Sequence, residues 1–115
     1  MQIHSYEDKG IYIVRVSGDI DHLSSSKVKE AVSYGISKYK SNKIIIDLKE
    51  VYFMDSSGIG MLIGRYKEMS LLCGEIVLSG INKSIKKILY LSGLHKIIKN
   101  FDSLNEAIKY YTKED

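Results

Sequence analysis

The sequence predicts an α/β fold: a mostly parallel central sheet with an antiparallel hairpin strand at its N-terminal side and about four helices. Two runs rich in β-branched and aromatic residues, 3–6 and 11–17, flank a short turn and predict the hairpin. Continuous apolar runs at 44–46 and 76–78 are typical of strands buried on both faces of a parallel sheet. Between these runs apolar residues recur three and four apart, the period of an amphipathic helix. The alternation predicts the order ββαβαβαβα in a single domain over residues 1–115.

The first half of the chain continues from the hairpin into a helix that Ser24 or Ser25 can cap, because a serine hydroxyl accepts a hydrogen bond from a free N–H group of the first turn. A buried strand over 43–48 comes next. A second helix is expected to begin near Ser57 and to end at Gly74, since glycine readily takes the left-handed conformation found at helix C-termini.

The second half repeats the alternation. A strand over 75–79 is followed by a helix that Asn82 can cap and Gly93 can end. A short last strand is expected over 97–101. A serine and a glutamate with the spacing of a capping box, at 103–106, predict a terminal helix.

Composition limits the classes of protein. The 115 residues are 44% hydrophobic and 27% charged, with both signs interleaved, which is typical of a folded domain. The net charge of +3 and the dispersed lysines argue against a dedicated nucleic-acid binder. The single cysteine, Cys73, excludes an intramolecular disulfide, and we expect it to be a half-buried apolar filler. The sequence shows neither a signal peptide nor an apolar run of the ~20 residues that span a membrane, so we expect a cytoplasmic protein.

Polar residues gather in two loops that follow predicted strands. One loop reads Gly18-Asp19-Ile20-Asp21-His22, and the other reads Phe53-Met54-Asp55-Ser56-Ser57-Gly58-Ile59-Gly60. The carboxyl ends of parallel strands meet at one edge of a sheet, where α/β proteins place their functional residues. We therefore expect a functional surface made by Asp21, His22, Asp55, Ser56, Ser57, Gly58, Ile59 and Gly60.

The segment at 55–58 has two interpretations. In the first, Asp55 or a serine caps free N–H groups of the second helix, and glycine lets backbones approach closely. In the second, the helix N-terminus receives an anion, so that a phosphate on Ser57 would lie at the positive end of the helix dipole. Spacing alone leaves both open.

The second loop and its continuation Gly64-Arg65-Tyr66-Lys67 resemble the signature of the anti-sigma factor antagonists, a group within the STAS domain family of sulfate transporters and anti-sigma factor antagonists. The resemblance is greatest to the sporulation branch, which acts on the sigma-F pathway. Further support comes from 18–22 and from Leu91-Ser92-Gly93-Leu94 with Lys96-Ile97-Ile98. The resemblance extends from about residue 11 to residue 107, nearly the whole chain.

This resemblance implies a regulated binding protein that is not an enzyme and needs no cofactor. Ser57 corresponds to the serine that is phosphorylated in the family, and Asp21 to an aspartate near it. The unphosphorylated form binds an anti-sigma factor and frees the sigma factor. The anti-sigma factor is also a serine kinase that inactivates the antagonist with ATP, and a PP2C-type phosphatase reverses the modification. Direct binding to nucleic acid or to a membrane is not expected.

Two alternatives stay within the fold: an antagonist of a different, general stress anti-sigma pair, and a nucleotide- or lipid-binding STAS module. The second has little support, because the glycines are followed by Arg65 and not by the Lys-Ser/Thr pair of a phosphate-binding loop. Arg65 and Lys67 are expected on a solvated helix face or in contact with a partner's acidic residues.

Catalysis and metal binding have weaker support still. A nucleophile elbow needs glycine two residues before the serine, where Asp55 stands. His4, His22 and His95 lack metal-ligand spacing, although His22 beside Asp21 could contact a partner.

Overall fold

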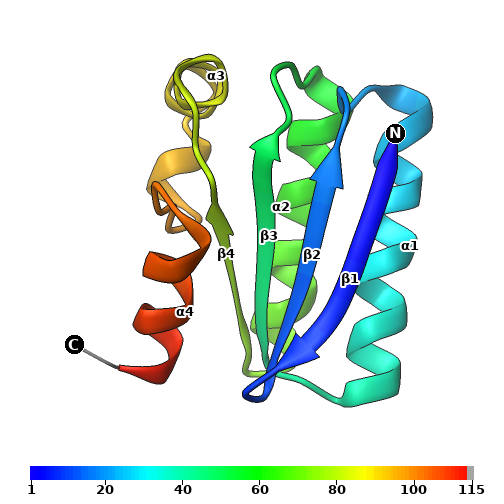
Figure 1. Ribbon diagram of the computed structural model, residues 1–115. Helices are drawn as coiled ribbons and strands as arrows, with labels where there is room; N and C mark the ends of the chain where they lie inside the picture. Colours follow the sequence, from blue (N-terminus) through cyan, green and yellow to red (C-terminus); the bar gives the residue numbers. More distant parts are fainter. Residues whose placement is uncertain (114–115) are drawn as a thin grey trace.

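The computed structural model describes residues 1–113, which form a four-stranded sheet with helices on both faces (Figure 1). The strands are β1 (Gln2–Asp8), β2 (Ile11–Ser17), β3 (Lys43–Glu50) and β4 (Glu75–Ser79). The helices are α1 (His22–Tyr39), α2 (Ser56–Leu71), α3 (Lys83–Ser92) and α4 (Leu104–Thr112), and a short 3-10 helix, η1 (Leu94–Lys96), follows α3. The predicted α/β class, with an N-terminal antiparallel hairpin and parallel strands after it, is confirmed.

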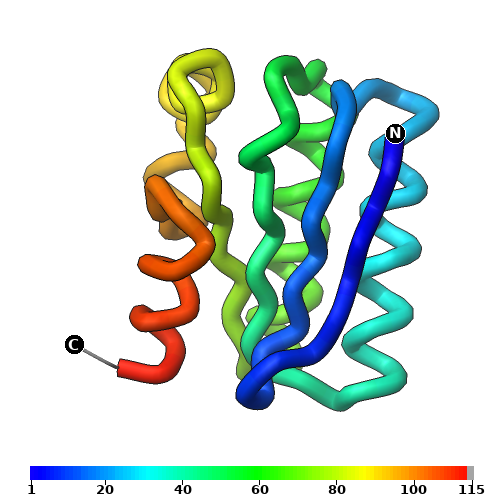
Figure 2. The backbone as a smooth tube through the Cα atoms, in the orientation of Figure 1, coloured from blue at the N-terminus to red at the C-terminus, as the bar shows by residue number. Residues whose placement is uncertain are grey.

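The order of strands in the sheet places the loops of interest at one edge. The order is β1-β2-β3-β4, with β1 antiparallel to β2 and with β2, β3 and β4 parallel to one another. The carboxyl ends of β2 and β3 therefore lie at the same edge, and Figure 2 shows that the N-terminus of the chain lies at that end too. The connections into α1 and α2 both start there.

Two apolar clusters hold the helices on the sheet. The larger cluster lies between the sheet and α1, α2 and α3. The smaller one lies under α4 on the opposite face and includes Tyr111. Side chains of β3 alternate between them, since Ile44 and Ile46 belong to the larger cluster and Ile45 to the smaller one. Burial on both faces explains why the run at 44–46 is continuously apolar.

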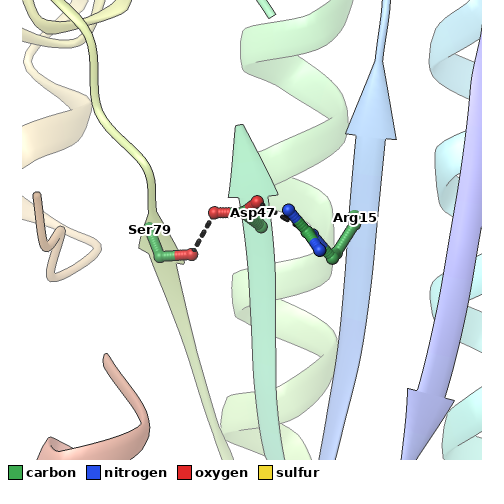
Figure 3. A network of polar contacts seen from close by, with 3 residues as sticks. All are labelled: Arg15, Asp47 and Ser79. Carbon is green, nitrogen blue, oxygen red and sulfur yellow. Dashed lines mark hydrogen bonds and ion pairs between the residues drawn. The ribbon is translucent and has the colours of Figure 1, made fainter. Parts of the chain in front are cut away.

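A buried carboxylate lies on the sheet face that carries α4. The side chain of Asp47, two residues after Ile45 and on the same face, is only 4% exposed. One of its oxygens accepts a hydrogen bond from Ser79 Oγ at 2.7 Å, and the other accepts one from Arg15 Nε at 3.3 Å (Figure 3). The three side chains join β2, β3 and β4 and compensate the charge that burial would otherwise leave unpaired.

The expected last strand at 97–101 is absent from the described sheet. The beginning of this segment is taken up by a turn, in which Ile98 N–H donates to the Leu94 carbonyl at 3.0 Å. Beyond the turn, Leu78 of β4 donates to the Lys99 carbonyl and accepts from Phe101 N–H, each at 2.9 Å. These bonds form an isolated parallel bridge, so the segment pairs with β4 at one point only.

The ends of α3 and the start of α4 follow the sequence signals. Asn82 Oδ1 accepts from Ile85 N–H at 3.0 Å, and Gly93 ends α3 with a left-handed φ of 78°. Ser103 Oγ accepts from Glu106 N–H at 3.2 Å. These caps depend only on local spacing, which the sequence displays directly.

The end of α2 differs from the prediction. Cys73, not Gly74, takes the left-handed conformation, with φ of 57°, and Cys73 is exposed rather than half-buried. Gly74 instead permits a close approach, because a Cβ atom there would lie 2.8 Å from the Asn42 carbonyl oxygen. The glycine is needed for packing between α2 and the start of β3 and not for its own φ.

Candidate functional site

Backbone hydrogen bonds join the two candidate loops. Ile20 N–H donates to the Phe53 carbonyl at 3.0 Å, and Asp55 N–H donates to the Ile20 carbonyl at 3.1 Å. Ile20 and Met54 form an isolated parallel bridge. Pairing between the two chain segments thus continues past the ends of β2 and β3, and it brings the N-termini of α1 and α2 side by side.

Asp55 is the N-cap of α2. Its Oδ1 accepts hydrogen bonds from Ser57 N–H at 2.9 Å and from Gly58 N–H at 3.2 Å. The carboxylate therefore satisfies two free N–H groups of the first turn and places a negative charge at the positive end of the helix. The side-chain hydroxyls of Ser56, which is exposed, and of Ser57, which is half-buried, do not supply the cap.

The hydroxyl of Ser57 faces α1. Ser57 Oγ lies 3.5 Å from His22 Nδ1, at the long limit of a hydrogen bond. His22 is the first residue of α1, so this contact crosses from one helix N-terminus to the other. The structure thus brings together two side chains that are 35 residues apart in the sequence.

Asp21, not Ser24 or Ser25, is the N-cap of α1. Its Oδ1 accepts from Ser24 N–H at 2.9 Å, and Ser24 Oγ accepts from Asp21 N–H at 2.8 Å, which completes a capping box. The Ser24 backbone N–H, followed by the Ser24 hydroxyl, holds the pKa of Asp21 below its ordinary value. Asp21 is therefore an anion held in place next to His22 in the chain as well as a structural cap.

The two glycines of the loop have different surroundings. A Cβ atom on Gly58 would collide with Met54 and lie 3.0 Å from Ile20 Cγ2, so Gly58 is required for the close packing of the two loops. A Cβ on Gly60 or on Gly64 would meet no atom within 4 Å. These two glycines therefore leave open space beside α2, while Ile59 is half-buried and packs against the core.

Exposed apolar side chains lie in and next to the two loops, and the sequence reasoning did not predict their exposure. Leu23, Tyr52 and Phe53 are each more than half exposed. In the connection that follows β3, Val51 and Met54 are buried while the residues between them face solvent. Large apolar residues that remain exposed next to a polar loop are typical of a protein-binding surface.

Arg65 does not lie on a solvated face as expected. Its side chain is 11% exposed and pairs with Glu68, with 3.6 Å between Nε and Oε1. Lys67 is exposed, as predicted for a solvated position. The sequence shows both residues as charges on one helix and cannot show that the arginine stem packs against neighbouring elements.

The candidate site is an open surface. Four hollows elsewhere on the described chain are lined by residues outside this surface. Within residues 1–113 no group of three or more His, Cys, Asp or Glu side chains is arranged to hold a metal ion. In the same part of the chain no helix combines the length and apolar character that crossing a membrane requires.

The chain belongs to the STAS domain family, because residues 2–107 match the family model of the STAS domain. The family predicted from the two loops is thus confirmed. Its relatives include an anti-sigma F factor antagonist of Paenibacillus polymyxa, which is 36% identical over 94% of this chain and 92% of its own length. An anti-sigma-B factor antagonist of Listeria monocytogenes is 35% identical over 73% of each chain.

Solved structures show the same fold. The anti-sigma factor antagonist SpoIIAA in its unphosphorylated form matches with a TM-score of 0.83 and 23% identity, over 99% of both chains. The predicted likeness to the sporulation branch therefore holds in sequence, through the Paenibacillus relative, and in fold, through SpoIIAA.

Proposed function

We propose that this protein is an anti-sigma factor antagonist that binds its anti-sigma factor through the surface around Ser57 and is released when Ser57 is phosphorylated. The observation that carries the proposal is the place of Ser57 in the first turn of α2, beside His22 and without a capping role. Because Asp55 supplies the cap, the Ser57 hydroxyl is free to accept a phosphate without loss of the helix N-terminus. The names of the Paenibacillus and Listeria relatives support this class of partner.

The proposed cycle assigns the chemistry to the partners. The anti-sigma factor acts as a serine kinase that transfers a phosphoryl group from ATP to Ser57, and a PP2C-type phosphatase removes it. This protein contributes a binding surface and an acceptor hydroxyl and needs no cofactor of its own. Asp21, His22 and the residues from Asp55 to Gly60 form the surface that the partner covers.

Phosphorylation would act on the surface and not on the fold. A phosphate adds about 1.5 to 2 negative charges, and it would do so on the surface that carries the carboxylates of Asp21 and Asp55, the N-caps of α1 and α2. Negative charge at a helix N-terminus is tolerated or stabilises by ~0.3–1 kcal/mol, so α2 has no reason to unfold. A partner that covers the same surface would have to bury the phosphate without a matched cation, which is unfavourable.

A pair of serine variants tests the proposal. Ser57→Ala and Ser56→Ala should both keep the fold and bind the organism's own anti-sigma F factor in a pull-down. After incubation with that factor and ATP, mass spectrometry should find phosphate on the wild type and on Ser56→Ala but not on Ser57→Ala. Phosphate on Ser56 would refute the assignment, and a wild type that does not bind would refute the function.

Backbone chemical shifts test the mechanism. On phosphorylation they should change mainly at 21–22 and 55–60, the two loops that share the surface. Changes that extend to α4, on the far side of the sheet, would indicate a conformational switch instead. Unmodified Ser57→Ala, treated with the same kinase and ATP, is the matched control.

The sigma-F pathway is the better candidate of two. The Paenibacillus sigma-F relative aligns at 36% identity over 94% of this chain, whereas the Listeria sigma-B relative aligns at 35% over 73% and a second sigma-F relative at 30% over 71%. Pull-downs with the anti-sigma F and anti-sigma-B factors should therefore show tighter binding to the first. Tighter binding to the second would assign the protein to the stress pathway.

A further inference from the structure

The outward face of α3 has a composition unlike the rest of the surface. Residues at the spacing i, i+3, i+4, i+7 and i+8 form one face of a helix. On α3, counted from Lys83, the five residues at this spacing are all exposed. The N-terminal part of this face is basic, and the C-terminal part is apolar, with Tyr90 68% and Leu91 77% exposed. A hollow of about 360 Å³ lies among these side chains. The α3 face consists of Lys83, Lys86, Lys87, Tyr90 and Leu91.

The positive charge of the α3 face is not balanced locally. Residues 76–101 contain five lysines and no aspartate or glutamate, whereas the whole chain has a net charge of only +3. The first turn of α3 has no acidic residue, and Lys83 stands at its first position. Cations at that end are repelled by the positive end of the helix dipole. The arrangement works against the stability of α3, which indicates that the lysines serve another purpose.

The α3 face adjoins the surface around Ser57. The N-cap residue of α3, Asn82, donates from Nδ2 to the Val51 carbonyl at 2.7 Å. Val51 directly precedes the exposed Tyr52 and Phe53, and Figure 1 shows α3 and the connection from β3 to α2 at the same end of the sheet. The connection that bears Tyr52 and Phe53 is therefore tied at one end to the start of α3 and leads at the other into the first turn of α2, where Ser57 lies.

The surface around Ser57 is too small to be a whole interface. A stable protein–protein interface uses about 20–30 residues on each side, while the loops supply eight candidate residues and the three exposed apolar ones. Further area must come from a neighbouring element. On α1 the acidic Glu30 directly follows Lys29, and Lys38 already lies over the rings of Tyr34 and Tyr39. The α3 face has exposed apolar groups and no acidic residue of its own.

We propose that the α3 face is a second contact for the anti-sigma factor and that it binds an acidic surface of that factor with an apolar side chain at its centre. The apolar side chain enters the hollow between the lysine stems and Tyr90, and the acidic groups pair with Lys83, Lys86 and Lys87. The inference rests on the proposed function. Because the loops around Ser57 bear Asp21 and Asp55, the whole docking surface is acidic at one end and basic at the other, and the partner is complementary to both ends.

Charge reversal with a matched control tests the α3 face. Lys86→Glu/Lys87→Glu changes the face. Lys109→Glu/Lys113→Glu makes the same change in net charge at two exposed positions, one in α4 and one at its C-cap, on the opposite side of the sheet. Binding to the organism's own anti-sigma F factor is measured by calorimetry at 50 mM and at 500 mM NaCl, with thermal melting of each variant. Tyr90→Ser/Leu91→Ser tests the apolar end in the same way.

The α3 charge variant should bind at least about tenfold more weakly at low salt, with a smaller difference at high salt, while the α4 variant binds like the wild type. The α3 charge variant should melt no lower than the wild type, because removing lysines from the first half of α3 relieves the repulsion by the dipole. Equal binding by the α3 charge variant and the wild type, or equal weakening by the α4 variant, would overturn the inference alone. A wild type that does not bind the factor would instead overturn the proposed function.

Discussion

Gly58 and Gly60 lie two residues apart on α2, and replacing each by alanine should change stability in opposite directions. A Cβ on Gly58 would collide with Met54 and approach its Sδ to 2.9 Å and Ile20 Cγ2 to 3.0 Å. Met54 and Ile20 are themselves buried, so neither can move aside without disturbing the contact between the two loops. A Cβ on Gly60 would point into open space.

The magnitudes follow from two opposing effects. Alanine in place of glycine within a helix stabilises by ~0.5–1 kcal/mol, because glycine loses more conformational freedom on folding. Overpacking a filled site costs ~1–3 kcal/mol. Gly60→Ala should therefore stabilise the protein by ~0.5–1 kcal/mol, whereas Gly58→Ala should destabilise it by about 1 kcal/mol after the gain in helix propensity is subtracted.

Urea denaturation followed by circular dichroism at 25 °C measures both changes, and Gly64→Ala is a second control at an open position. The two control variants should have higher midpoints than the wild type, and Gly58→Ala a lower one, with similar slopes. A Gly58→Ala variant as stable as Gly60→Ala would refute the reasoning, since it would mean that the loops do not require a glycine for their close approach.

Three further predictions concern the polar groups. Arg15→Met should destabilise the protein by about 1 kcal/mol or more beyond the effect of Asp47→Asn, as measured by urea denaturation. Arg15→Met leaves the buried Asp47 carboxylate without its cation, whereas Asp47→Asn leaves Arg15, which is partly exposed and can reach water. A larger loss for Asp47→Asn would contradict this reasoning. Ser24→Ala should raise the Asp21 pKa toward its ordinary value in an NMR titration. Since a carboxyl with a lowered pKa contributes stability that is lost as pH falls through its folded pKa, this variant should lose less stability on acidification than the wild type. Tyr111→Phe should cost ~0.5–1.5 kcal/mol in urea denaturation, because the Tyr111 hydroxyl lies 2.9 Å from the buried Ile44 carbonyl; an unchanged midpoint would show that this hydrogen bond has no net effect.

The sequence was sufficient where structure depends on local spacing. The cap at Asn82 and the buried strand at 44–46 follow from patterns within a few residues. The segment at 97–101 has the apolar residues of a strand, but it begins in a turn that starts at Leu94 and forms a single bridge, from Asn100 to Leu78. Pairing of distant segments is not visible in a local pattern.

The candidate site shows the same division between local and distant information. The two loops and their family could be recognised from the residues alone, and Asp55 as a cap was one of two open interpretations. The exposure of Phe53 beside the buried Met54 could not be recognised, because both are apolar and only the bridge to Ile20 decides which one faces inward. The same bridge sets the approach of His22 to Ser57, which needs the two helix N-termini to lie side by side.

The cap of α2 also limits what a phosphate on Ser57 would do if the proposed function holds. Asp55 already accepts the N–H groups of Ser57 and Gly58, so the donors nearest to the phosphate are in use. A phosphate that displaced Asp55 would exchange one anion for another at the same helix end, with little net change in stability. A phosphate that left Asp55 in place would have to project from the surface, near His22 and over the open face at Gly60. In both cases α2 stays folded and negative charge increases at the acidic end of the docking surface, so the loss of binding originates in the partner's contact and not in this protein's fold.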